Sequence, residues 1–155
     1  MKYTKYHLEY NSSYTVFEFE SDGPRGKIKK IIQYSETSIK YIYNLGFGDK
    51  DDETGEFDDF SKSNNDDIYN VIATVVESIY IFTEVNPYYW IYIEANDTAR
   101  NRLYRIVLTL NYLDFMRDFE ILGFSKGNWD EFQKNKDYEA FLIKRKQSKF
   151  VRHEK

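Results

Sequence analysis

An apolar stripe between Ile68 and Phe82 limits the folds open to this chain more than any other feature. Its members recur at helical spacing: Ile68, Val71, Ile72, Val75, Ile79 and Phe82. The spacing predicts a helix that is capped by Asn65 or Asp66 and runs to about Thr83. We interpret its apolar side as core rather than as a binding groove.

Alternating apolar and polar residues predict three strands before this helix, at 14–20, 27–34 and 38–45. A turn at 21–26 supplies glycine and proline between the first two. Because the connections are short, we expect an antiparallel meander. Residues 46–65 are acidic and poor in apolar side chains, which predicts a long loop.

Three further strands are expected after the helix, at 88–94, 119–124 and 138–144. A second helix is predicted to begin at Asp97 or Thr98 and to end near Tyr112. Its expected buried face consists of Leu103, Ile106, Val107 and Leu110. We expect a turn at 125–128 and a short helical turn at 129–132.

The resulting order, β-β-β-α-β-α-β-β, predicts an α+β fold. We expect an antiparallel-rich sheet of about six strands with two main helices on one face. The length of 155 residues fits a single domain over 1–155. Its ordered core is expected to span about 14–146, with an acidic loop at 46–65 and a polar C-terminal tail at 147–155.

Aromatic side chains make up 19% of the chain, with fifteen tyrosines, twelve phenylalanines and two tryptophans. Tyrosine and phenylalanine favour strands, which predicts an aromatic sheet core. The alternative is that some tyrosines form an exposed platform on which bases or sugars stack.

The chain has no cysteine, which excludes disulfides, thiolate metal sites and cysteine nucleophiles. Residues 1–10 alternate tyrosines and charges, unlike a signal peptide. We see no run of about 18 apolar residues for a membrane span. These features predict a cytoplasmic protein without a membrane partner.

The net charge of −4 is unevenly distributed along the chain. Residues 49–67 carry nine acids against two lysines, whereas 144–155 carry six basic residues against one acid and 25–40 five against one. The overall charge argues against a general nucleic-acid coat protein. Each patch fits either a solvated face or a focused anion site.

The segment from Asn96 to Arg105 is the best candidate for such an anion site. Arg100, Arg102 and Arg105 fall within the first two turns of the second helix, where free N–H groups and the helix dipole already attract anions. Arginine binds phosphate in a bidentate way. Thr98 is expected to cap this helix, and Tyr104 and Asn44 to line the site. The alternative is a solvated helix face whose arginines pair with acids.

Other chemistry finds little support in the sequence. Asp49, Asp51 and Glu53 have the spacing of the first ligands of a calcium loop, but Thr54 replaces its glycine and Phe60 its bidentate acid. A looser site at Asp58, Asp59, Asp66 or Asp67 stays open, yet we predict no metal and no cofactor. The two histidines, His7 and His153, lie near the termini, and a phosphate-binding loop motif is missing. No catalytic residue is assigned, and whether the protein is an enzyme stays open.

Three separated segments resemble a family of small bacterial proteins of unknown function: residues 43–49, residues 64–67 leading into 71–75, and residues 98–105. The spacing of Phe132, Tyr138 and Phe141 adds to the resemblance, which spans about 14–146. Asn96-Asp97 stands where members of the family carry a Gly-Ser pair. The resemblance implies no established activity, and its association with toxin–antitoxin or defence pairs names no mechanism.

Two functions follow as expectations. The first is binding of a phosphate-bearing ligand, nucleic acid or a nucleotide, by a toxin-like or defence component. The second is a non-enzymatic interaction module that binds another protein, such as an antitoxin, through the acidic loop and the aromatic sheet. The second predicts ion-paired arginines and a contiguous exposed aromatic patch.

Overall fold

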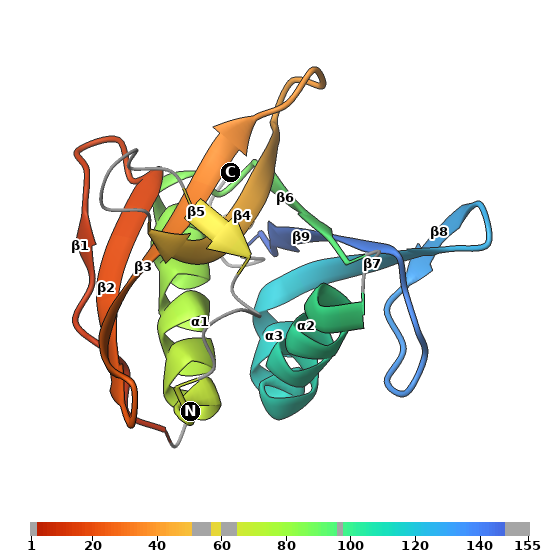
Figure 1. Cartoon of the computed structure of the whole chain (residues 1–155). Helices are drawn as coiled ribbons and strands as arrows, with labels where there is room; N and C mark the ends of the chain where they lie inside the picture. The colour runs from red at the N-terminus through yellow and green to blue at the C-terminus, as the bar shows by residue number, and fades with distance from the viewer. Residues whose placement is uncertain (1–2, 51–56, 60–64, 96–97, 148–155) are drawn as a thin grey trace.

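The computed structural model describes residues 3–50, 57–59, 65–95 and 98–147. Within these residues nine strands form one curved sheet, and three helices lie on one side of it (Figure 1). The strand order is β1-β2-β3-β4-β6-β9-β7-β8, and β5 pairs separately with β4. The α+β class and the placement of the helices on one face are as predicted, but the number of strands is larger.

The predicted meander is confirmed in the N-terminal half. Strands β1 (Glu9–Tyr10), β2 (Val16–Gly23), β3 (Gly26–Glu36) and β4 (Ile42–Lys50) each pair antiparallel with the next.

Part of the predicted acidic loop belongs to the sheet. Gly46 and Gly48, which we assigned to the loop, pair with Gln33 and Ile31 inside the sheet. Strand β5 (Phe57–Asp59) then adds to the end of β4. Residues 51–56 and 60–64 of the predicted loop, and 148–155 of the predicted tail, lie outside the described residues.

Helix α1 (Ile68–Val85) confirms the first predicted helix, and its apolar stripe lies in the core. The predicted caps at Asn65 and Asp66 are wrong, because Asp67 occupies the cap position and makes no side-chain cap bond. Its carboxylate instead accepts hydrogen bonds from the Tyr6 hydroxyl (2.6 Å) and from Ser21. By length and hydropathy alone α1 is compatible with a membrane span, although 56% of it is buried inside the protein.

The C-terminal half is built from four strands: β6 (Trp90–Glu94), β9 (Ala140–Arg145), β7 (Phe119–Ser125) and β8 (Asn128–Glu131). Strand β6 runs parallel to β4, and the other pairs are antiparallel. The predicted helical turn at 129–132 is wrong, because residues 128–131 form β8. The turn at Lys126-Gly127, where both residues have positive φ (51° and 82°), returns the chain as a hairpin.

The second predicted helix corresponds to α2 (Thr98–Leu110), and a third helix that the sequence analysis missed, α3 (Tyr112–Asp118), follows it. The break lies at buried Asn111, whose side chain donates to the Val107 carbonyl (2.8 Å). Leu110 is 45% exposed, so its predicted burial is wrong. The buried residues of α2 are Leu103, Tyr104, Val107 and Leu108.

Aromatic rings pack between the helices and the sheet, which confirms the predicted aromatic core. Phe82 of α1 is fully buried and stacks on Tyr34 of β3, with ring centroids 4.2 Å apart. In the C-terminal half, Phe132, Tyr138 and Phe141 lie within 5.5–6.1 Å of one another. A single cluster of buried side chains connects both halves, consistent with one domain.

Candidate functional site

The face of the sheet that points away from the helices carries the candidate site, and we call it the outer face. Side chains alternate between the two faces of a strand. Ile91 and Ile93 of β6 are buried in the core, so Trp90, Tyr92 and Glu94 point to the outer face.

Large apolar side chains cover the outer face of β6, β9, β7 and β8. We call this set the aromatic face: Trp90, Tyr92, Leu122, Phe124, Trp129 and Leu142. Strand pairing places its members side by side, with Tyr92 opposite Leu142, Leu142 opposite Leu122, and Phe124 opposite Trp129.

Ring contacts join the members of the aromatic face that lie nearest its edge. The ring centroids of Phe124 and Trp129 are 5.1 Å apart, and those of Tyr92 and Trp129 are 6.4 Å apart in an edge-on arrangement. Trp129 is 39% exposed, whereas Trp90, Tyr92 and Phe124 are partly buried. The rings therefore form a contiguous surface rather than isolated exposed residues.

Carboxylates border this surface. Glu94, Glu120 and Glu131 occupy outer-face positions beside it, while Lys144 lies over the Trp90 ring at 5.6 Å. Partial burial raises the pKa of Tyr92, and the nearby Glu94 and Glu139 raise it further. The border of the aromatic face therefore carries three carboxylates and one lysine, which is the cross-strand partner of Glu120.

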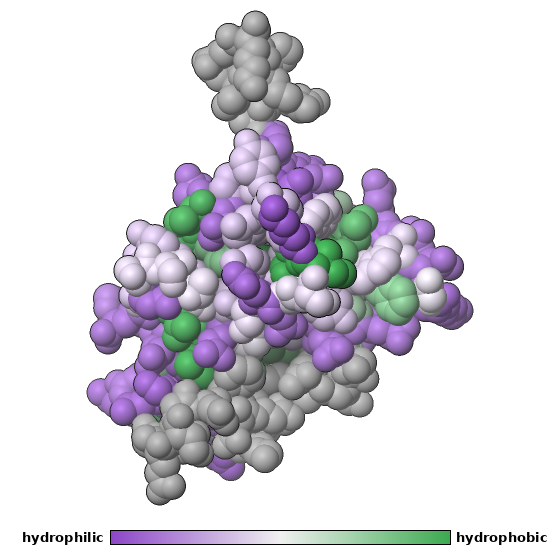
Figure 2. Space-filling model, turned by 90° about the horizontal axis from the view of Figure 1, so that it is seen from above, coloured by the Kyte–Doolittle hydropathy of each residue, from purple (hydrophilic) through white to green (hydrophobic). Residues whose placement is uncertain are grey.

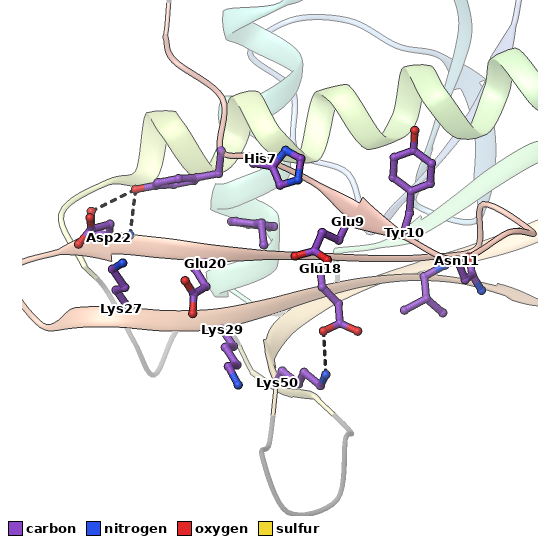
Figure 3. A pocket seen from close by; sticks show the side chains of 13 residues that line it. His7, Glu9, Tyr10, Asn11, Glu18, Glu20, Asp22, Lys27, Lys29 and Lys50 are labelled. Atoms are coloured by element: carbon purple, nitrogen blue, oxygen red, sulfur yellow. Dashed lines mark hydrogen bonds and ion pairs between the residues drawn. The ribbon is translucent and has the colours of Figure 1, made fainter.

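The same outer face has a different character over β2, β3 and β4. A groove of about 850 Å³ lies there beside the N-terminal segment. Figure 3 shows Glu18, Glu20, Lys27, Lys29 and Lys50 around it. Glu20 is the cross-strand partner of Lys29, and Lys50 donates to Glu18 at 2.7 Å. Oppositely charged neighbours at these spacings are typical of a solvated sheet face.

One sheet face thus changes from ionic in its N-terminal half to aromatic in its C-terminal half. From above, green surface lies in the middle and in separate spots on both sides, among purple and near-white patches (Figure 2). A partly exposed apolar surface of this kind is a candidate binding site.

The structure does not bring all six residues of the predicted anion site together. Arg102 and Arg105 are exposed on α2, and Arg105 forms an ion pair with Asp137 (2.9 Å). Tyr104 is only 5% exposed and points into the core near Tyr34. Asn44 lies on the outer face of β4, opposite Tyr92 and therefore beside the aromatic face. The side chains of Thr98 and Arg100 lie outside the described part of the chain.

An asparagine that the sequence analysis did not single out anchors the start of α2. Asn101 donates to the Ala95 carbonyl at the end of β6 (3.2 Å) and to the Tyr138 carbonyl (2.8 Å). These bonds hold the first turn of α2 between β6 and the segment before β9. The exposed arginines are thereby presented on a fixed part of the fold.

Polar clusters elsewhere in the described residues are structural. Fully buried Ser21 donates to the Asp67 carboxylate and accepts a hydrogen bond from the Asn65 side chain beneath the β2–β3 turn. Within the described residues, no three His, Asp or Glu side chains are placed to hold a metal ion. Asp67 of the proposed looser metal site is engaged with Tyr6 and Ser21.

The sequence analysis gave an exposed aromatic surface only as the alternative to an aromatic core, and it did not name Trp90, Phe124 or Trp129. The sequence did contain a signal for the first of these residues. Trp90, Ile91, Tyr92 and Ile93 alternate along a strand, which places Trp90 and Tyr92 on one face. For Trp129 the signal was hidden, because residues 129–132 were assigned to a helical turn.

Comparison with known proteins gives a family and no activity. No curated protein and no solved structure matches the chain. The model of a family of unknown function, DUF6934, matches residues 2–146, nearly the whole chain. This match agrees with the resemblance noted in the sequence, and the chain belongs to the DUF6934 family.

Proposed function

We propose that this protein is a non-enzymatic interaction module whose aromatic face binds a protein partner. The observation that carries the proposal is the contrast within one sheet face, ionic over β2–β4 and aromatic over β6–β9–β7–β8. Tryptophan and tyrosine are the residues on which interface energy most often concentrates. Trp129, in contact with Phe124 and Tyr92, is the expected anchor.

The charges around the aromatic face define the chemistry of the partner. Glu94, Glu120 and Glu131 disfavour phosphate groups and favour Lys or Arg at the rim of the interface. We therefore expect a partner surface with an apolar centre and basic residues around it. A toxin–antitoxin or defence pair is one setting for such a module, and this setting stays a prediction.

Site-specific photo-crosslinking in native cells tests the proposal. A photoreactive phenylalanine analogue at Tyr92 is expected to give a discrete higher-mass adduct, because this position lies within the aromatic face. The matched control carries the analogue at Leu113, which is 82% exposed on α3 in the helix layer. Adding Trp129→Ala is expected to reduce the yield at Tyr92 by about tenfold or more, as for an anchor residue.

Equal adduct patterns at Tyr92 and Leu113, or a yield at Tyr92 that Trp129→Ala leaves unchanged, would contradict the proposal. Tyr69→Ala is the control for losing an aromatic side chain, since Tyr69 is 42% exposed on α1. It is expected to leave the yield at Tyr92 unchanged.

A phosphate-bearing ligand, nucleic acid or a nucleotide, is a second candidate, supported by the exposure of Arg102 and Arg105 on one side of α2. Exposed pairs such as Arg105–Asp137 open at low cost, so the ion pair does not block a phosphate. If this site binds nucleic acid, Arg105→Ala is expected to weaken binding of labelled single-stranded RNA and to lower the salt slope by about one.

Filter binding or fluorescence anisotropy at two salt concentrations measures this effect. Arg117→Ala removes an exposed arginine from α3 and is the control. An Arg105→Ala variant that binds RNA as tightly as the unchanged protein would remove Arg105 from the site. Duplex and single-stranded DNA probes separate the classes of nucleic acid.

A further inference from the structure

Strand β8 forms one end of the sheet and borders the aromatic face. It is last in the strand order, its only described strand neighbour is β7, and all four of its residues are exposed. The β7–β8 hairpin extends away from the helices (Figure 1). An edge strand of this kind is a template for pairing with another chain.

The register shows which backbone groups of β8 are available. A two-residue turn closes the hairpin, so Ser125 and Asn128 form a hydrogen-bonded pair. Hydrogen-bonded and non-bonded pairs then alternate along an antiparallel ladder. The bond from the Phe132 N–H to the Ile121 carbonyl (3.0 Å) is in phase with this pattern. The N–H and C=O groups of Trp129 and Glu131 therefore point away from β7.

Charge argues against a second copy of this chain as the occupant of this edge. Suppose that two copies pair antiparallel through the outward backbone groups of Trp129 and Glu131. Trp129 of one copy then lies opposite Glu131 of the other. Asp130 then lies opposite Asp130 of the other copy, and like charges directly opposite one another are destabilising. Asp130 and Glu131 instead favour a strand that carries basic side chains.

We infer that the protein partner adds an extended segment to β8, with a basic residue beside Asp130 and an apolar residue against Trp129. The inference rests on the proposed function and specifies how the partner is recognised. Main-chain bonds to Trp129 and Glu131 supply affinity, and the side chains of the aromatic face supply specificity. The added strand extends the sheet and covers Trp129.

A synthetic eight-residue peptide of alternating valine and lysine serves as the probe, with a valine–glutamate peptide as its control. Binding of the lysine peptide is expected to slow amide hydrogen exchange at Trp129 and Glu131, measured by NMR. The amide of Asp130 already faces β7 and is expected to change less. The glutamate peptide is expected to bind at least tenfold more weakly.

Two substitutions at one position separate backbone pairing from charge. Glu131→Pro removes the outward N–H without removing a bond to β7, a change that edge strands tolerate. Glu131→Gln removes the same charge and keeps the N–H. We expect Glu131→Pro to bind the lysine peptide at least tenfold more weakly than Glu131→Gln, with circular dichroism confirming that both are folded.

Equal binding by Glu131→Pro and Glu131→Gln, or unchanged exchange at Trp129 in saturating lysine peptide, would overturn strand addition. The proposed function has a separate outcome. If the Tyr92 crosslink persists while both results are negative, the aromatic face binds its partner without adding a strand. If the Tyr92 crosslink fails as well, the interaction module itself is refuted.

Discussion

Replacing Phe82 with alanine is expected to lower the free energy of unfolding by about 3–5 kcal/mol, the range for large-to-small changes at buried aromatic residues. Phe82 is fully buried and contacts the rings of Tyr34, Tyr43 and Tyr89. Removing the Phe82 ring leaves a cavity between α1 and β3. The neighbouring aromatic rings are flat and tightly packed, so they cannot move to fill it.

Urea unfolding followed by tryptophan fluorescence measures the change. Both tryptophans lie on the outer face of the sheet, whereas Phe82 lies in the core on the other side, so their native signal is expected to remain. Leu113→Ala, at an 82% exposed position, is the control and should change stability by less than about 0.5 kcal/mol. A loss below about 1 kcal/mol for Phe82→Ala would contradict the packing described for this half of the core.

Gly123→Ala is expected to lower the free energy of unfolding by about 2–3 kcal/mol. A Cβ atom at this position in β7 would lie 2.3–2.7 Å from three ring atoms of Tyr138. Tyr138 cannot withdraw, because its ring is packed between Phe132 and Phe141 and its hydroxyl accepts a bond from the Gln133 N–H (2.9 Å).

A double-mutant cycle assigns this loss to the contact itself. Tyr138→Leu removes the ring atoms that meet the new methyl group, although alone it also destabilises the fold. If the contact is responsible, the two changes together cost less than the sum of their separate effects, by about 1 kcal/mol or more. Strict additivity would show that Gly123→Ala acts by another route.

Local patterns in the sequence predicted most of the fold. The stripe from Ile68 to Phe82 and the short-range alternation of the first three strands follow from the periods of helices and strands. The failures occurred where distant residues decide local structure. Residues 129–132 were assigned to a helical turn, but 128–131 form a strand because β7 supplies a pairing partner. Helix α3 was missed, and its Phe115 is fully buried in the core.

The candidate site was predicted less well than the fold. A helix N-terminus with three arginines is visible in one segment, but the aromatic face combines residues from four strands that are separated by up to about 50 positions in the chain. Strand order determines which alternating residues become neighbours, and the sequence does not encode that order in any short segment. The buried position of Tyr104 shows the same limit, since the register of α2 depends on its packing partners.

Hydroxyl-radical footprinting of the tagged protein recovered from native cells tests the central claim most directly. The same preparation is compared before and after a wash that removes bound components. The account predicts that Trp90, Tyr92 and Trp129 are protected from oxidation before the wash and become reactive after it, whereas exposed Tyr69 on α1 reacts equally in both. Equal oxidation of the three outer-face residues in the two samples, or protection of Tyr69 instead, would contradict the assignment of the aromatic face as the partner-binding surface.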